Sequence, residues 1–205
     1  MIFAAPFRYP QTALVRRHGP QGYSKYSHHR PWLRDEFDFR CVYCLKREQW
    51  CFQLNDYQLD HLVPQSIAPA LCREYTNLVY ACSNCNHRKG AKRLPTPEDL
   101  AYGACMEVLM TGANIGEIVA HNDDGIRLID ELGLDQKKIT GMRKLFILSI
   151  RSHQKHDRRL FLTWMGLPDD LPDLANVRPQ PERNMRIEGI VESWFCRKPR
   201  PEFYE

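Results

Sequence analysis

Short apolar runs and polar stretches alternate in the first half of this 205-residue chain. The runs QLDHLV (58–63) and NLVYAC (77–82) have the length of buried strands, and a loop containing Pro64 and Pro69 separates them. The polar stretch NHRKGAKR that follows begins as a helix, which Gly90 loosens or ends. The pattern therefore predicts a strand, a loop, a strand and a helix, which together form a ββα unit.

The chain after residue 95 is patterned mainly as helix. The sequence TPED offers Thr96 as an N-cap and Asp99 as a capping acid, and the apolar residues through Leu109 keep helical spacing. We therefore expect a helix from Thr96, then a short strand at 116–120 and a two-turn helix closed by Gly133.

Residues 136–165 form the longest periodic segment, with an apolar face and a basic face. The basic face carries one acid, Asp157, so it is either simply solvated or turned towards phosphate groups. The candidate inward positions are Ile139, Met142, Leu145, Phe146, Ile150, Phe161 and Trp164, and the basic positions are Lys137, Lys138, Arg143, Lys144, Arg151, Lys155, Arg158 and Arg159.

The N-terminal segment is rich in Pro and Gly, with one possible short helix at WLRDEF. Through Arg34 it carries six Lys or Arg and no acid, and Tyr9, Tyr23, Tyr26 and Trp32 lie among them. We predict four parts: a basic N-terminal arm (1–37), a core domain (38–95), a mainly helical extension (96–167) and a proline-rich C-terminal strap (168–205).

The overall composition narrows the class of protein. A hydrophobic content of 43% is ordinary for a globular domain, and a net charge of +4 permits an anionic partner without requiring one. The chain has no run of about 18 apolar residues and no charged-then-apolar leader. We therefore expect a cytoplasmic protein with no membrane association.

Four of the eight cysteines form two C-x-x-C pairs, Cys41 with Cys44 and Cys82 with Cys85. Two such pairs can place four thiolates around one tetrahedral Zn²⁺, whatever the length of chain between them. The alternatives are a redox pair or ordinary buried thiols, and the second pair makes both less attractive. The sequence therefore predicts a structural zinc site, and the other cysteines are interpreted as small apolar residues.

Asp60 and His61 stand side by side inside the first apolar run. Burying either group without a partner costs several kcal/mol, so each needs a ligand, a hydrogen bond or a catalytic duty. One alternative is a core histidine bonded to an aspartate with no catalytic role. On a strand the two side chains point to opposite sides of the backbone, which favours separate tasks.

Taken together, the motifs CVYC, LDHLVPQS, TNLVYAC and CSNCNHRKG resemble the HNH endonuclease family over residues 41 to about 93. More loosely, the whole chain is similar to a group of bacterial HNH proteins with a PWLRDEFDFRCVYC lead-in and a helical tail. The resemblance implies an α+β fold with a zinc-stabilised ββα-metal core. It also implies a DNA endonuclease that hydrolyses phosphodiester bonds with one catalytic divalent metal, leaving 5′-phosphate and 3′-hydroxyl ends.

The resemblance assigns roles to particular residues. His61 is the expected general base, since an imidazole can be neutral at physiological pH and take a proton from water. Asn77 is the expected positioning residue for His61, and Asp60 a ligand of the metal. The family's last His is replaced here by Asn86, with His87 one residue later.

Asn86 and His87 are alternative second ligands for the catalytic metal. An Asn86 amide oxygen suits Mg²⁺ or Mn²⁺, whereas a His87 nitrogen suits softer ions such as Zn²⁺, Ni²⁺ or Co²⁺. Asn86 is favoured, because one residue turns a helix by about 100° and carries His87 away from the metal.

Basic residues cluster on and just after this helix, and they are either phosphate contacts or ordinary surface charge. The expected partner is DNA, with RNA not excluded, and a homodimer or larger complex would suit double-strand cleavage. The alternative function is a non-catalytic zinc-dependent nucleic-acid-binding module or an inactive HNH subunit. The candidate phosphate contacts are Arg88, Lys89, Lys92 and Arg93.

Overall fold

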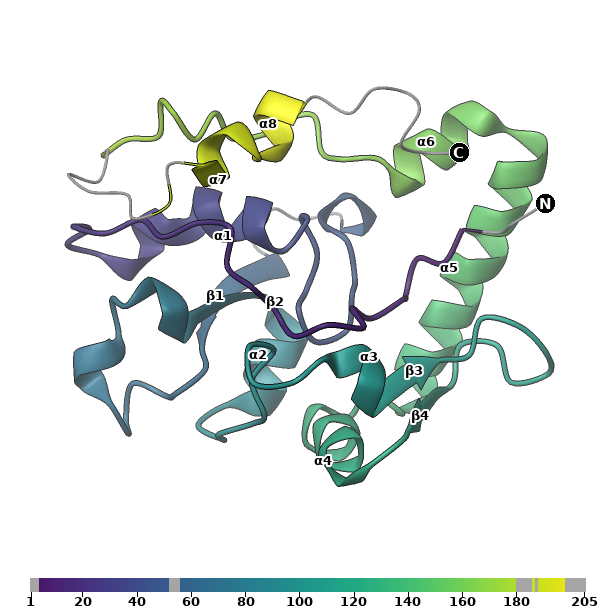
Figure 1. The fold of residues 1–205 in the computed structure, drawn as a ribbon. Coiled ribbons are helices and arrows are strands. Elements are labelled where there is room, and N and C mark those ends of the chain that lie inside the picture. Colours follow the sequence, from purple (N-terminus) through teal and green to yellow (C-terminus); the bar gives the residue numbers. More distant parts are fainter. Residues whose placement is uncertain (1–3, 52–55, 180–185, 187, 198–205) are drawn as a thin grey trace. The chain divides into compact units, whose positions relative to one another are not determined.

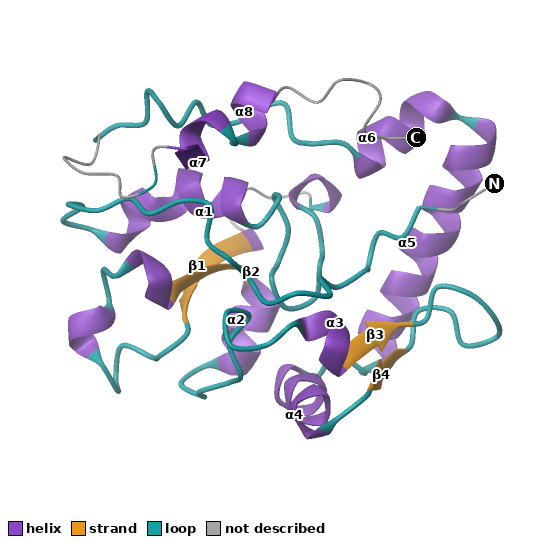
Figure 2. Cartoon of the chain, in the orientation of Figure 1, coloured by secondary structure: helices purple, strands orange, loops and turns teal. Residues whose placement is uncertain are grey.

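The computed structural model describes residues 4–51, 56–179, 186 and 188–197. The chain divides into two compact units, each built from several stretches of sequence. The first comprises Met1–Leu14, Tyr43–Lys46 and Leu94–Gly166, and the second comprises Val15–Val42, Arg47–Arg93 and Leu167–Glu205. Both contain helices and one two-stranded antiparallel sheet, so the fold class is α+β, as predicted (Figure 1, Figure 2).

The second unit contains the predicted ββα arrangement. Strand β1 (Tyr57–His61) pairs antiparallel with β2 (Leu78–Cys82), with Asp60 opposite Val79 and His61 opposite Leu78. Helix α2 (Ser83–Lys89) begins directly after β2 and ends at Gly90, whose φ of 54° is one that an L side chain rarely adopts. The strands and helix expected from the apolar pattern are therefore confirmed.

Short helical segments complete the second unit. A buried hydrogen-bond contact anchors the segment before α1 (Arg30–Glu36), because His18 Nε2 lies 2.8 Å from Asp35 Oδ1. Arg16, part of the predicted basic arm, is also buried and donates to the carbonyl of Leu78 on β2. The segments are η1 (Tyr26–His29), α1 (Arg30–Glu36), η2 (Glu48–Trp50), η4 (Pro69–Leu71), η5 (Tyr75–Asn77), α7 (Glu188–Val191) and α8 (Trp194–Arg197).

The first unit contradicts the helix predicted from Thr96. The predicted cap does form, since Thr96 Oγ1 accepts from Asp99 N at 3.2 Å, but the chain only turns there. Helix α3 is one turn (Tyr102–Cys105), and the apolar residues after it form strand β3 (Met106–Val108). Strand β3 pairs with β4 (Ile118–Ala120), so strand pairing outweighs the helical spacing of these residues.

The remaining helices of this unit follow the sequence more closely. Helix α4 (Asp123–Leu132) ends at Gly133 in the left-handed conformation, as predicted. The long periodic segment is two helices, α5 (Lys137–His156) and α6 (Arg158–Met165), because Asp157 caps α6 by accepting from Leu160 N.

The face of α5 that is buried differs from the predicted one. Ile150 is buried as expected, but Met142 and Leu145 are 45% and 59% exposed. Arg143 is buried in their place and donates through Nε to the carbonyl of Gly116 at 2.7 Å. Arg143 therefore does not belong to the basic surface.

The predicted C-terminal strap lies partly outside the described residues, which omit 180–185, 187 and 198–205. Where it is described, Trp194 connects it to the rest of the second unit by donating its backbone N–H to Asp35 Oδ2 and its indole N–H to Asp38 Oδ1. None of the helices in the described parts of the chain has the length and apolar character needed to cross a membrane.

Candidate functional site

The four cysteines of the two C-x-x-C pairs lie together. Their sulfur atoms are all within 4.8 Å of one another, and Cys41, Cys82 and Cys85 are buried. Zinc–sulfur bonds of about 2.3 Å in a tetrahedron place the sulfurs about 3.8 Å apart, so the cluster is close to the geometry of a zinc site. The donor chemistry fits Zn²⁺, and none of these four cysteines forms a disulfide.

Backbone geometry brings each pair to the cluster. A bridge between Arg40 and Arg47 closes the turn that carries Cys41 and Cys44, and Leu45 in it has a positive φ of 59°. Cys82 is the last residue of β2, and Cys85 lies one turn into α2. The cluster thus joins the start of the matched motif to the junction of β2 and α2.

Asp60 and His61 are both buried on β1, with 4% and 8% of their surfaces exposed. Their side chains have different partners, as expected for neighbours on a strand. Asp60 faces α2, where its Oδ1 lies 3.0 Å from the ammonium of Lys89. His61 instead contacts Cys72, Gln65 and Tyr26.

Two side-chain hydrogen bonds connect β1 with α2. Gln58 and Asp60 lie two residues apart on one side of β1, and Asn86 and Lys89 lie three residues apart on one side of α2. The Asn86 amide donates to Gln58 Oε1, and Lys89 donates to Asp60. Asn86 therefore faces β1, whereas the neighbouring His87 is exposed.

His61 is held by a backbone carbonyl. Its Nε2 lies 3.0 Å from the oxygen of Cys72, and because a carbonyl can only accept, the tautomer with its proton on Nε2 is the one that forms this hydrogen bond. In that tautomer Nδ1 is the acceptor nitrogen. The amide nitrogen of Gln65 lies 3.0 Å from the same Nε2 and 3.5 Å from Nδ1, and the ring of Tyr26 packs edge-on at a centroid distance of 5.0 Å.

Asn77 makes no hydrogen bond to His61 among the contacts of the described residues, but it fixes the loop around it. Its Oδ1 accepts from Val63 N at 2.8 Å, and its Nδ2 donates to the carbonyls of Val63 and Leu71. The carbonyl that holds His61 belongs to Cys72, the residue after Leu71. The structure thus gives Asn77 an indirect path to the His61 ring.

The four candidate phosphate contacts differ in exposure. Lys92 and Arg93 are exposed and Arg88 is half-buried, whereas Lys89 is 1% exposed. The sequence groups Lys89 with the phosphate contacts, but its ammonium is bonded to Asp60 and to the carbonyl of His61. A sequence signal for this pairing exists, since Lys89 shares a helix face with Asn86.

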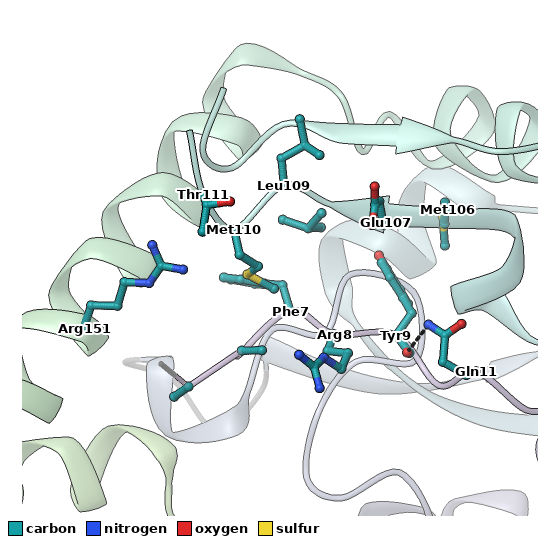
Figure 3. Close-up of a pocket in the computed structure, with 13 residues that line it drawn as sticks. Phe7, Arg8, Tyr9, Gln11, Met106, Glu107, Leu109, Met110, Thr111 and Arg151 are labelled. Carbon is teal, nitrogen blue, oxygen red and sulfur yellow. Dashed lines mark hydrogen bonds between the residues drawn. The ribbon is translucent and has the colours of Figure 1, made fainter. Parts of the chain in front are cut away.

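A separate cavity of about 710 Å³ lies in the first unit, outside the ββα region. The side chains of Phe7, Leu109 and Met110 line it together with Arg8 and Arg151 (Figure 3). No motif in the sequence points to this cavity.

The comparison with protein families finds one match in this region. The family model described as HNH endonuclease matches residues 41–92, roughly a quarter of the chain. No curated protein and no solved structure matches the chain. The match confirms the resemblance predicted from the motifs, and it supports a nuclease or nucleic-acid-binding role for this region.

Proposed function

We propose that this protein is a metal-dependent HNH endonuclease that hydrolyses phosphodiester bonds in DNA. The observation that carries the proposal is that Asp60, His61, Asn77 and Asn86 all lie within the stretch that matches the HNH endonuclease model. The four-cysteine cluster supports it, since a structural Zn²⁺ there would hold the two ends of this stretch together.

His61 is proposed as the general base. In its neutral form it would accept a proton from the attacking water through Nδ1, while the Cys72 carbonyl holds Nε2–H. Asn77 is proposed as its positioning residue, because it fixes the loop that carries this carbonyl. The hydroxide formed would attack the phosphorus, and the departing sugar oxygen would leave as the 3′-hydroxyl after protonation.

The residues fit a hard divalent ion such as Mg²⁺ or Mn²⁺ in their donor chemistry. Asp60 offers a carboxylate and Asn86 an amide oxygen, from elements that face each other. Such an ion would neutralise charge on the phosphate and stabilise the leaving oxygen. The position of Asn86 towards β1 favours it over the exposed His87 as the second ligand.

A nucleic-acid-binding module without catalysis is the second candidate. The observation that favours it is the buried Lys89, whose ammonium already satisfies the charge of Asp60. In that case Lys92 and Arg93 would bind phosphates while Asp60 and Lys89 form a structural ion pair.

Cleavage of supercoiled plasmid separates the two candidates. We expect nicked or linear product with Mg²⁺ or Mn²⁺, and a loss of at least a hundredfold in rate in His61→Ala, since general-base catalysis contributes about 10²–10⁴-fold. His156→Ala, at an exposed position on α5, is the matched control and retains activity. DNA binding without cutting under any metal would support the second candidate, and full activity in His61→Ala would remove His61 as the base.

The same assay answers the remaining questions about substrate and product. A panel of single- and double-stranded DNA and RNA tests the expected preference for DNA. Cleavage rates measured against protein concentration test whether two copies act together on a double-strand break.

A further inference from the structure

Lys89 is one of the most buried side chains of the protein, although its head group is charged. It is 1% exposed at the C-terminal end of α2, and its Nζ donates to Asp60 Oδ1 at 3.0 Å and to the carbonyl of His61 at 2.6 Å. Lysine is almost never fully buried unless it is paired, so the contact with Asp60 is what allows this position. The chain therefore places its own cation on the carboxylate proposed to bind metal.

An ammonium and a divalent ion compete for the same oxygen. Mg²⁺ binds oxygen ligands at about 2.1 Å, and Asp60 Oδ1 has the Lys89 ammonium 3.0 Å away. Both cations on one oxygen would lie within a few ångströms of each other, where a buried site screens their repulsion poorly. An ion that binds Oδ1 must therefore move the ammonium away.

We propose that Lys89 sets the metal affinity of this site: its ammonium and the divalent ion exclude each other from Asp60 Oδ1. Binding of the ion releases Lys89 from Asp60, and loss of the ion allows Lys89 to return. The inference rests on the proposed function, because it takes Asp60 as a metal ligand. It adds that metal loading is opposed by a built-in competitor and changes the position of one side chain on α2.

Titration of the full-length zinc-loaded protein with Mn²⁺, followed by calorimetry or electron paramagnetic resonance, tests this directly. Mn²⁺ is suitable because hard ions do not replace thiolate-bound zinc. Lys89→Met keeps the length of the side chain but removes its charge, and we expect it to bind Mn²⁺ at least tenfold more tightly than the wild type. Lys138→Met, an exposed lysine on α5, is the matched control and keeps wild-type affinity.

A second measurement uses the wild-type protein and so does not depend on how a variant folds. An amine-acetylating reagent followed by mass spectrometry reports the reactivity of each lysine. We expect Lys89 to be protected without Mn²⁺ and labelled several-fold faster with it, while labelling of Lys138 stays constant.

The outcomes separate failure of this inference from failure of the proposed function. Mn²⁺ binding that Asp60→Asn abolishes, but that Lys89→Met leaves within twofold of wild type with Lys89 still protected, overturns the competition and leaves the metal site intact. Absence of Mn²⁺ binding in the wild type and in Lys89→Met overturns both. Thermal melting and zinc content confirm that each variant is folded.

Discussion

The cysteine cluster and the Asp60 site lie in the same matched region, but their negative charges are neutralised in different ways. The sulfur atoms of four cysteines lie within 4.8 Å of one another, and as thiolates they would all be negatively charged. Asp60 has the Lys89 ammonium 3.0 Å from its carboxylate. Four thiolates need an ion from outside the chain, whereas Asp60 has a counter-ion supplied by the chain.

This difference distinguishes the zinc expected to stabilise the fold from the divalent ion proposed for catalysis. The cysteine cluster is compatible with a structural Zn²⁺, and binding of such an ion would contribute directly to the free energy of folding. Asp60 can stay buried without a second metal, because Lys89 is its counter-ion. The comparison predicts that a zinc ion in the cysteine cluster is retained during purification, while the proposed catalytic ion exchanges.

The largest expected effect follows from breaking the cysteine cluster. Cys82→Ser should lose the zinc and unfold most of the region from 41 to 92, because structural zinc contributes roughly 10–16 kcal/mol in zinc-finger peptides. Zinc per chain and the circular dichroism melting curve measure both effects. Cys105→Ser, another buried cysteine but outside the cluster, should keep its zinc. Normal zinc content in Cys82→Ser would contradict the assignment.

Breaking the Asp60–Lys89 pair should have a smaller but still large effect. Asp60→Leu leaves a buried ammonium without its carboxylate, which costs about 3–5 kcal/mol of stability. The double variant Asp60→Leu with Lys89→Met removes both charges and should recover most of this loss. Urea unfolding of the zinc-loaded proteins measures the difference, and a single variant within about 1 kcal/mol of wild type would show that the pair is not structurally important.

A substitution in the loop around His61 should lower the free energy of unfolding less than a substitution in the cysteine cluster or in the Asp60–Lys89 pair. Asn77→Ala removes the acceptor for Val63 N and the donor to the carbonyls of Val63 and Leu71, and buried groups left unsatisfied cost about 1–3 kcal/mol. Urea unfolding gives the loss of stability, and hydrogen exchange at the Val63 amide shows whether it is local. Asn77→Asp keeps the acceptor, so Val63 should stay protected in that variant.

Much of the ββα region could be predicted from local signals. The spacing of Cys41, Cys44, Cys82 and Cys85 anticipates the cluster, and the positive φ of Gly90 agrees with its place at the end of α2. These features depend on neighbours along the chain or on a ligand geometry that ignores loop length. These features can therefore be predicted from the sequence without knowledge of the tertiary structure.

The contacts of the site could not be predicted in the same way. The pairing of Lys89 with Asp60 joins residues 29 positions apart and depends on how α2 packs on β1. Charged residues on a short polar helix are usually exposed, so the sequence favours a surface role for Lys89. Only the shared face of Asn86 and Lys89 could have suggested otherwise.

The errors in the first unit have the same origin. The helix predicted from Thr96 continues into residues that pair as β3 with β4, although a strand predicted at 116–120 already required a partner. On α5, the buried Arg143 donates to the carbonyl of Gly116, a residue distant in sequence, and the neighbouring Met142 is exposed. Periodicity alone does not contain these long-range partners.

The smallest predicted effect concerns His29, a buried group that needs no counter-ion because burial favours its neutral form. Burial lowers the pKa of His29, whose ring is 1% exposed and lies between Tyr23 and Tyr75. Below an unfolded-state pKa of about 6.5, the unfolded chain binds a proton that the folded protein takes up only at lower pH, so stability falls as pH falls.

His29→Gln should remove this contribution. The difference in unfolding free energy between wild type and variant should then shrink as the pH is lowered from 7.5 towards 5, which urea unfolding at several pH values can measure. Parallel profiles would mean that His29 accepts its proton equally well in the folded and unfolded states. Converging stability profiles would show that His29 is buried in its neutral form. It would then differ from the cysteine cluster, which needs an external ion, and from Asp60, which has a counter-ion from the chain.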